Sequence, residues 1–252
     1  MALIGGVFIR REKISKAGHP KIVLAYCIVE AHAEVKVPAA GVEGALIRPV
    51  RIGALRCFVS DLSSPVEPDS LPGMAKAFQG VLQRIFAENA IIPFRFPTVV
   101  ESERELMQFV ESRSGEYREA LQRLRGKLQM DIRIVAEPSR NRGTVAGTEL
   151  SRRSGKEYLR AKSERRKEVE AALKVLRRAA GSQVDQWIER DTASGMRAFA
   201  LLSRSSLPGF VEKLRQVHTP AGTSTRVTGP WPPSEFVEIN DEEVRENSTS
   251  AE

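Results

Sequence analysis

Residues 184–204 read VDQWIERDTASGMRAFALLSR, and this stretch predicts a β-hairpin in the second half of the chain. Two strand-forming runs, VDQWIERD and MRAFALLSR, flank the connecting TASG. We expect a long helix before this hairpin, a shorter helix after it, and a strand at each end of the segment. The order strand, helix, strand, strand, helix, strand is the ferredoxin-like split βαβ arrangement, a four-stranded antiparallel sheet with its helices on one face.

The periodicity of apolar residues predicts the other elements of this segment. MDIRIVAE (residues 130–137) predicts its first strand, and TSTRVTG (residues 223–229) its closing strand. Residues 156–180 predict the long helix, and Ser206 is expected to cap the shorter one. The expected apolar faces are Val169, Ala172, Leu173 and Leu176 on the long helix, and Leu207, Phe210, Val211, Leu214 and Val217 on the shorter one.

The first half of the chain predicts a small mixed sheet. Residues 22–31 predict a buried strand, and residues 45–62 predict two short strands that turn at Gly53. Residues 90–100, AIIPFRFPTVV, predict one further strand. Its prolines place it at an edge or end of the sheet, because proline cannot donate a ladder hydrogen bond.

Two helices are predicted in the first half. Residues 71–86 place their apolar side chains on one 3.6-residue face. Ser102 begins the second helix, and Glu105 completes a capping box with it. We expect this helix to run toward residue 128, with a kink or a break at Gly115.

These elements predict an α+β protein with two domains. The N-terminal domain, residues 21–127, combines the small mixed sheet with two helices, and the C-terminal domain, residues 128–238, is ferredoxin-like. A flexible leader over 1–20 and a disordered acidic tail over 239–252 are expected at the two ends.

The formal net charge of +7 equals the net charge of residues 151–180, which include the long helix, while the tail is acidic. The basic stretch 152–178 has three interpretations: a solvated helix that covers a sheet, a surface that docks an acidic protein, or a nucleic-acid-binding helix. Glutamates interleaved at helical spacing favour the first interpretation. Tyr158 is the one aromatic residue within this stretch, so base stacking is disfavoured.

The sequence predicts no catalytic residue, no metal site, no cofactor and no small-molecule substrate, because no nucleophile, phosphate-binding or metal-ligand motif occurs. Cys27 and Cys57 lie in apolar stretches and are expected to be buried free thiols, with a cross-strand disulfide as the alternative. Glu30, His32 and Glu34 alternate and would at most hold a metal weakly, and a Cys/His pair is the enzymatic alternative. Neither a signal peptide nor a transmembrane helix is predicted, so we expect a cytoplasmic protein without a membrane partner.

Residues 226–236, RVTGPWPPSEF, fix a tryptophan among three prolines. Each proline locks φ and removes an N–H donor, so Trp231 is held on a stiff backbone. Such stiffness suits a packing anchor or a contact surface. The P-x-x-P spacing also fits recognition by a polyproline-binding domain, which is unusual for a segment that ends a strand.

Several stretches together resemble the gas vesicle accessory proteins GvpF and GvpL. In chain order they are AIIPFRFPTVVESERELMQFVE, LRGKLQMDIRIV, SGKEYLRAK and RVTGPWPPSEFV. The resemblance implies a non-enzymatic accessory or structural protein of gas vesicle assembly, located in the cytoplasm and at the vesicle. It also implies the apolar vesicle shell protein and other accessory proteins as partners, and a two-domain α+β fold with a ferredoxin-like C-terminal half.

The chain departs from the pattern of this family at three places. Proline stands at 97, where the family commonly has glycine after Arg-Phe. Met130 replaces an acidic residue, although Asp131 is adjacent, and Ser234 replaces the tyrosine that usually follows the prolines. These differences indicate a divergent member and affect partner specificity more than the fold.

The predicted partner-binding residues come from the stiff corner, the proline-flanked strand and the start of the long helix. They are Gly229, Pro230, Trp231, Pro232, Pro233, Phe236, Pro93, Phe94, Arg95, Phe96, Gly155 and Tyr158. The alternative for these positions is core or inter-domain packing. The alternative function is nucleic-acid binding through the basic helix 152–178, although nucleic acid is the less favoured partner.

Overall fold

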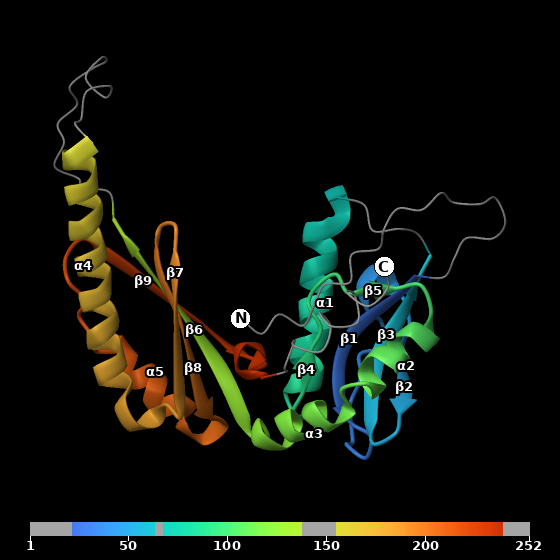
Figure 1. Cartoon of the computed structure of the whole chain (residues 1–252). Helices are drawn as coiled ribbons and strands as arrows, with labels where there is room; N and C mark the ends of the chain where they lie inside the picture. The colour runs from blue at the N-terminus through green and yellow to red at the C-terminus, as the bar shows by residue number, and fades with distance from the viewer. Residues whose placement is uncertain (1–21, 64–67, 138–154, 239–252) are drawn as a thin grey trace, which may run out of the picture. The chain divides into compact units, whose positions relative to one another are not determined.

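The computed structural model describes residues 22–63, 68–137 and 155–238 as a mixed α+β fold with two antiparallel sheets (Figure 1). The chain falls into two compact units. The first comprises Met1–Gly126 together with Pro232–Glu252, and the second comprises Lys127–Trp231. The sequence placed the residues after Trp231 in the C-terminal domain as far as 238, whereas here they group with the first unit. The predicted leader and acidic tail lie outside the described residues, as does nearly all of the loop before the long helix.

The sheet of the first unit is built around its first strand, which is buried on both faces. Every strand pairing in this sheet is antiparallel, so the mixed sheet predicted for the first half of the chain is wrong. The strand order is β2-β3-β1-β4, and β5 also pairs with β1. As predicted, β2 and β3 form a hairpin that turns at Gly53, where φ is +55°. The strand bounds are β1 Ile22–Glu30, β2 Ile47–Ile52, β3 Leu55–Leu62, β4 Ile92–Pro93 and β5 Val99–Val100.

The single strand predicted over 90–100 is wrong, because the structure has two short strands there. Both β4 and β5 pair antiparallel with β1 at the sheet edge. Pro93 and Pro97 lack the N–H groups that a continuous ladder needs. The peptide bond before Pro97 is cis. The segment between the two strands instead donates Phe94 N–H to the Tyr26 carbonyl at 2.9 Å.

The helices of the first unit are α1 Leu71–Phe86, α2 Glu103–Glu111 and α3 Ser114–Arg123. The predicted break in the second helix lies at Ser112 and Arg113, and not at Gly115, because Arg113 leaves the helical region with φ −123° and ψ 22°. Ser102 caps α2 by accepting the Glu105 N–H at 3.3 Å. The Glu105 carboxylate accepts the N–H of Glu101, one residue earlier than the ordinary capping box.

The second unit has the predicted element order, strand, helix, strand, strand, helix, strand. Its sheet has the strand order β7-β8-β6-β9, and α4 packs against one face (Figure 1). The predicted inner face of α4 is buried, at Val169, Ala172, Leu173 and Leu176. The bounds are β6 Lys127–Ala136, α4 Gly155–Ala180, β7 Gln186–Thr192, β8 Gly195–Ser203, α5 Leu207–Arg215 and β9 Thr223–Trp231.

Two local predictions in the second unit are wrong. The closing strand does not stop at Gly229 but continues to Trp231, because a bulge inserts Gly229 and Pro230 between two paired positions of β9. The Ser206 hydroxyl makes no capping bond. It hydrogen-bonds the Ser203 hydroxyl at 2.8 Å, since a 3₁₀ turn, Arg204–Ser206, already leads into α5.

The hairpin between β7 and β8 generates a stability prediction at Gly195. A Cβ atom at this position would lie 2.1 Å from the Ile134 carbonyl oxygen. The backbone of β6 cannot move away without breaking its ladder hydrogen bonds. Gly195→Ala should therefore lower the free energy of unfolding by about 2 kcal/mol. Urea denaturation is the measurement. Ser194→Ala, in the exposed turn beside it, is the control and should change the stability by less than about 0.5 kcal/mol; equal effects of the two variants would contradict the close approach.

Candidate functional site

The sheet of the second unit uses its two faces differently, and β6 shows why. Ile132 and Ile134 are fully buried on the face that α4 covers. Asp131 and Arg133 alternate with them and therefore point to the opposite face. Among the described residues of this unit, neither α4 nor α5 covers that opposite face (Figure 1). We call it the open face.

An arginine from each of the four strands lies in one row across the open face. The ladder pairs Arg190 with Arg197, Arg197 with Arg133, and Arg133 with Arg226. Directly paired residues point to the same side of a sheet, and adjacent strands lie about 4.8 Å apart. Arg133, Arg197 and Arg226 are exposed, and Arg190 is partly exposed. We call these four residues the arginine row.

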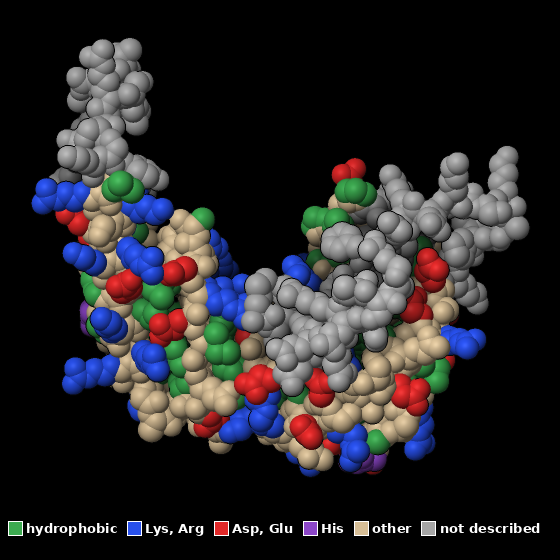
Figure 2. Space-filling view, viewed as in Figure 1, with side chains coloured by type: hydrophobic (Ala, Val, Ile, Leu, Met, Phe, Trp, Pro, Cys, Tyr) green, Lys and Arg blue, Asp and Glu red, His purple; other side chains and the backbone are tan. Residues whose placement is uncertain are grey.

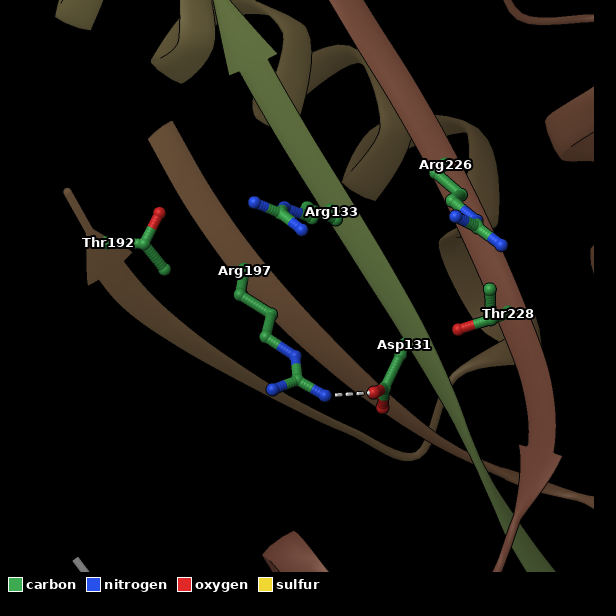
Figure 3. Close-up of a pocket in the computed structure, with 6 residues that line it drawn as sticks. All are labelled: Asp131, Arg133, Thr192, Arg197, Arg226 and Thr228. Carbon is green, nitrogen blue, oxygen red and sulfur yellow. Dashed lines mark hydrogen bonds and ion pairs between the residues drawn. The ribbon is translucent and has the colours of Figure 1, made fainter. Parts of the chain in front are cut away.

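A shallow pocket of about 380 Å³ lies over three of these arginines. Figure 3 shows the side chains that line it on β6, β7, β8 and β9. The lining residues are Asp131, Arg133, Thr192, Arg197, Arg226 and Thr228. Three guanidinium groups, two hydroxyls and one carboxylate supply many hydrogen-bond donors and an excess of positive charge, which suits an anionic ligand.

Contacts with neighbouring side chains hold Arg190 and Arg197 of the arginine row in place. The Arg197 guanidinium donates to the Asp131 carboxylate (Figure 3). The Gln129 amide donates to the same carboxylate at 2.8 Å. Arg190 and Arg197 both lie over the ring of Phe199, at 5.2 and 4.8 Å from its centroid. Arg133 and Arg226 make no hydrogen bond or ion pair with any residue that the structure describes. Among the described residues, none therefore competes with a partner for these two cations.

The corner GPWPP meets the open face at one residue. Trp231 pairs with Gln129 and therefore lies on the same face as the arginine row. Its ring is half-buried, and its indole N–H donates to the Thr228 hydroxyl at 3.4 Å. Gly229 and Pro230, which form the bulge, are exposed. A Cβ atom on Gly229 would lie 2.7 Å from the Met130 sulfur, so this close approach favours glycine.

The remaining residues of the corner are buried in the first unit. Pro232 and Pro233 are buried, and Phe236 is 2% exposed. The Phe236 carbonyl accepts a hydrogen bond from the Arg123 guanidinium at 2.8 Å. These contacts are those of a packed segment, the alternative expected for these residues.

Most of the proline-flanked segment also packs inside the first unit. Phe94 is 3% exposed and lies 6.5 Å from Phe109 between ring centroids. The ring centroids of Phe96 and Phe78 are 5.1 Å apart. Pro93 and Phe96 are partly exposed, and Arg95 is the one exposed residue among these four predicted contact residues.

The basic helix α4 uses part of its charge to hold β7. Arg166 pairs with Asp191 at 3.0 Å, and Arg177 pairs with Glu189 at 3.1 Å. Lys and Arg side chains gather along the outer surface of α4 (Figure 2). Gly155 and Tyr158 lie in the first turn of the helix, where the side-chain surroundings fall outside what the structure describes.

Sequence reasoning missed the arginine row. The one signal in the sequence is that each of the four strands has an arginine at a position that alternates with its buried residues. That signal does not reveal which arginines stand opposite one another, because the register between strands is set by turns and bulges.

The cysteines and the histidine singled out as an enzymatic alternative do not form a reactive pair. Cys27 and Cys57 are buried free thiols, which confirms the favoured prediction. Burial raises the pKa of the Cys57 thiol to about 12, and burial followed by the nearby Cys57 raises the pKa of Cys27 well above its ordinary value. A catalytic thiol needs a lowered pKa. The His32 side chain is 80% exposed and lies 3.4 Å from the Glu30 carboxylate.

The part of the chain that the structure describes also bears on metal binding and on membrane insertion. No group of three or more His, Cys, Asp or Glu side chains there is arranged to hold a metal ion. No described helix combines the length and the apolar character that crossing a bilayer requires.

The chain is similar to gas vesicle proteins in sequence and in structure. Residues 23–238 match the family described as gas vesicle synthesis protein GvpL/GvpF. Gas vesicle protein L of Streptomyces sp. (strain CB03234) is 25% identical over 211 residues, covering 76% of this chain and 77% of that protein. The crystal structure of GvpF from Anabaena sp. PCC7120 superposes with a TM-score of 0.70 at 16% identity, over 87% of this chain and 97% of that one. For GvpF from Microcystis aeruginosa the TM-score is 0.66 at 16% identity, over 86% and 99%.

The raised thiol pKa values generate a prediction about reactivity. Cys27 and Cys57 should both resist Ellman's reagent at pH 8 in the folded protein and react once urea unfolds it. An unfolded thiol loses its proton near pH 8.5, roughly, whereas the folded thiols keep theirs to higher pH. Because the folded pKa values are raised, the protonated thiols stabilise the fold fully below the pKa of the unfolded thiols. This stabilisation is lost as the pH rises from the unfolded toward the folded pKa. Stoichiometric labelling of the folded protein would contradict this description.

Proposed function

Because the chain belongs to the GvpL/GvpF family of gas vesicle synthesis proteins, which have an accessory role in gas vesicles, we propose that it assists vesicle assembly by binding other vesicle proteins. Its proposed partners are the apolar shell protein and further accessory proteins. The family is not one of known enzymes. Covering an apolar partner surface, or presenting it at a growing shell edge, would prevent its aggregation.

The observation that supports this proposal is that Trp231 and the arginine row lie on the same open face of the sheet. Trp and Arg are the residue types most enriched among residues that dominate protein–protein binding energy. The bulge sets Trp231 on a stiff backbone, which lowers the entropy lost when a partner binds. Of the residues predicted from the sequence, we propose Trp231, Gly229, Pro230 and Arg95 as contacts, because these retain exposed surface.

We further infer that the second unit is a ferredoxin-like domain. Its support is the strand order β7-β8-β6-β9, which places the first and third strands of the βαββαβ unit in the middle of the sheet. The domain limits proposed from the sequence are 21–127 and 128–238. The grouping of Lys127–Trp231 into one compact unit supports the first boundary, while the buried residues after Trp231 favour an earlier end for the second domain.

Co-purification tests the proposed function. The chain would be expressed with the shell protein and the other accessory proteins of its own organism at moderate salt. The wild type should retain the shell protein, and Trp231→Ala should retain much less. A tryptophan at the centre of an interface contributes about 2 kcal/mol or more, which is about thirtyfold in affinity. Val227→Ala is the matched control, because Val227 lies on β9 but pairs with Ile132 on the opposite face of the sheet.

Each outcome of this experiment decides one question, once circular dichroism shows that the variants fold. If the wild type and both variants retain the shell protein equally, Trp231 is a packing residue and the contact lies elsewhere. If the wild type captures no vesicle protein but carries nucleic acid that high salt removes, the assembly role fails and the basic helix becomes the candidate site.

A further inference from the structure

We propose that the arginine row is a docking site for an acidic α-helix of a partner protein, which lies across the four strands and pairs its carboxylates with the guanidinium groups. The inference deepens the proposed function and rests on it for the choice of a protein as partner. It concerns four residues, Arg190, Arg197, Arg133 and Arg226, none of which the sequence singled out.

The spacing of the row matches that of side chains along one face of a helix. Neighbouring strands are about 4.8 Å apart, so four arginines in register extend across roughly 14 Å. Glutamates at positions i, i+4 and i+8 of a helix are roughly 6 Å apart and extend along roughly 12 Å, so three glutamates face at most three of the four arginines. The long guanidinium side chains accommodate the small difference between the two repeats. An extended peptide repeats on one face every two residues, about 6.6 Å, and fits the row less well.

Charge complementarity identifies the partner as acidic. Arg133 and Arg226 have no ion-pair partner among the described residues, and guanidinium groups bind carboxylates through two parallel hydrogen bonds. Arg197 is held in place by Asp131 and by the ring of Phe199. Asp131 is also the one acid that lines the pocket. It competes with an incoming carboxylate for Arg197, and this competition is open to a direct test.

A nucleic-acid strand fits the same surface less well. Single-stranded nucleic acids need exposed aromatic rings on which bases stack. The ring that lies against the arginine row is Phe199, and it is 1% exposed beneath Arg190 and Arg197. Trp231 pairs with Gln129, four residues along β6 from Arg133, and is half-buried, so no exposed ring among the described residues lies beside the row. Arginines without an accessible ring supply charge and bidentate hydrogen bonds, which carboxylates on a rigid helix use well.

The test measures fluorescence anisotropy of a labelled helical peptide titrated with the full chain. The peptide is alanine-rich, about 20 residues long so that it forms a helix, and carries glutamate at every fourth position of one face. Its twin has glutamine at those positions. A single-stranded oligonucleotide of similar length is the third probe. We expect the glutamate peptide to bind about tenfold more tightly than its twin, and added salt to weaken it.

Three variants locate the binding. The double variant Arg133→Gln/Arg226→Gln should weaken binding of the glutamate peptide about tenfold, whereas Asp131→Asn should strengthen it about threefold by releasing Arg197. The matched control Arg165→Gln/Arg178→Gln removes two exposed arginines from α4 and should change nothing. Equal loss in the control and the double variant, or tighter binding of the oligonucleotide that the double variant abolishes, would overturn the proposal.

The same double variant separates this inference from the proposed function. If it co-purifies with the shell protein and the accessory proteins as fully as the wild type does, the vesicle role stands and the docking helix is refuted. If the wild type captures no vesicle protein while the glutamate peptide still depends on Arg133 and Arg226, the vesicle role fails and the specificity of the row is supported.

Discussion

The second unit depends on the alternation of side chains along β6. This strand pairs with β8 on one side and β9 on the other, so its register fixes the direction of every side chain in the sheet. Ile132 and Ile134 pack beneath α4, and the residues between them must face away. A slip of one residue would bury Arg133 and expose both isoleucines. The hydrophobic core and the cationic face are therefore two results of one constraint.

The two ends of β6 protect this register in different ways. At its C-terminal end, Gly195 allows the β7–β8 hairpin to approach the Ile134 carbonyl. Near its N-terminal end, the bulge at Gly229 and Pro230 adds one residue to β9 and lets Trp231 rejoin the ladder opposite Gln129. Without the bulge the pairing would leave the tryptophan out of step with Thr228. The stiff corner thus positions an aromatic side chain on the open face.

The sequence predicts the regular elements well because one rule of periodicity governs each of them. It predicts less where local chemistry decides. Prolines divide the segment 90–100, a non-helical Arg113 breaks the second helix, and the bulge extends the last strand. Aromatic residues in such irregular segments carry no periodic signal of direction. Phe94 and Phe236 therefore resemble contact residues in the sequence, although they are buried in the structure.

The arginine row lies beyond sequence reasoning for a related reason. Each arginine is visible at a polar position of its own strand, but the row exists only once four strands are aligned. Like charges directly opposite one another destabilise a sheet. Asp131 and the ring of Phe199 offset part of that cost for Arg197, and nothing in the described structure offsets it for Arg133 beside Arg226. A fold selected for stability alone gains nothing from such an arrangement, whereas a surface that binds carboxylates requires it.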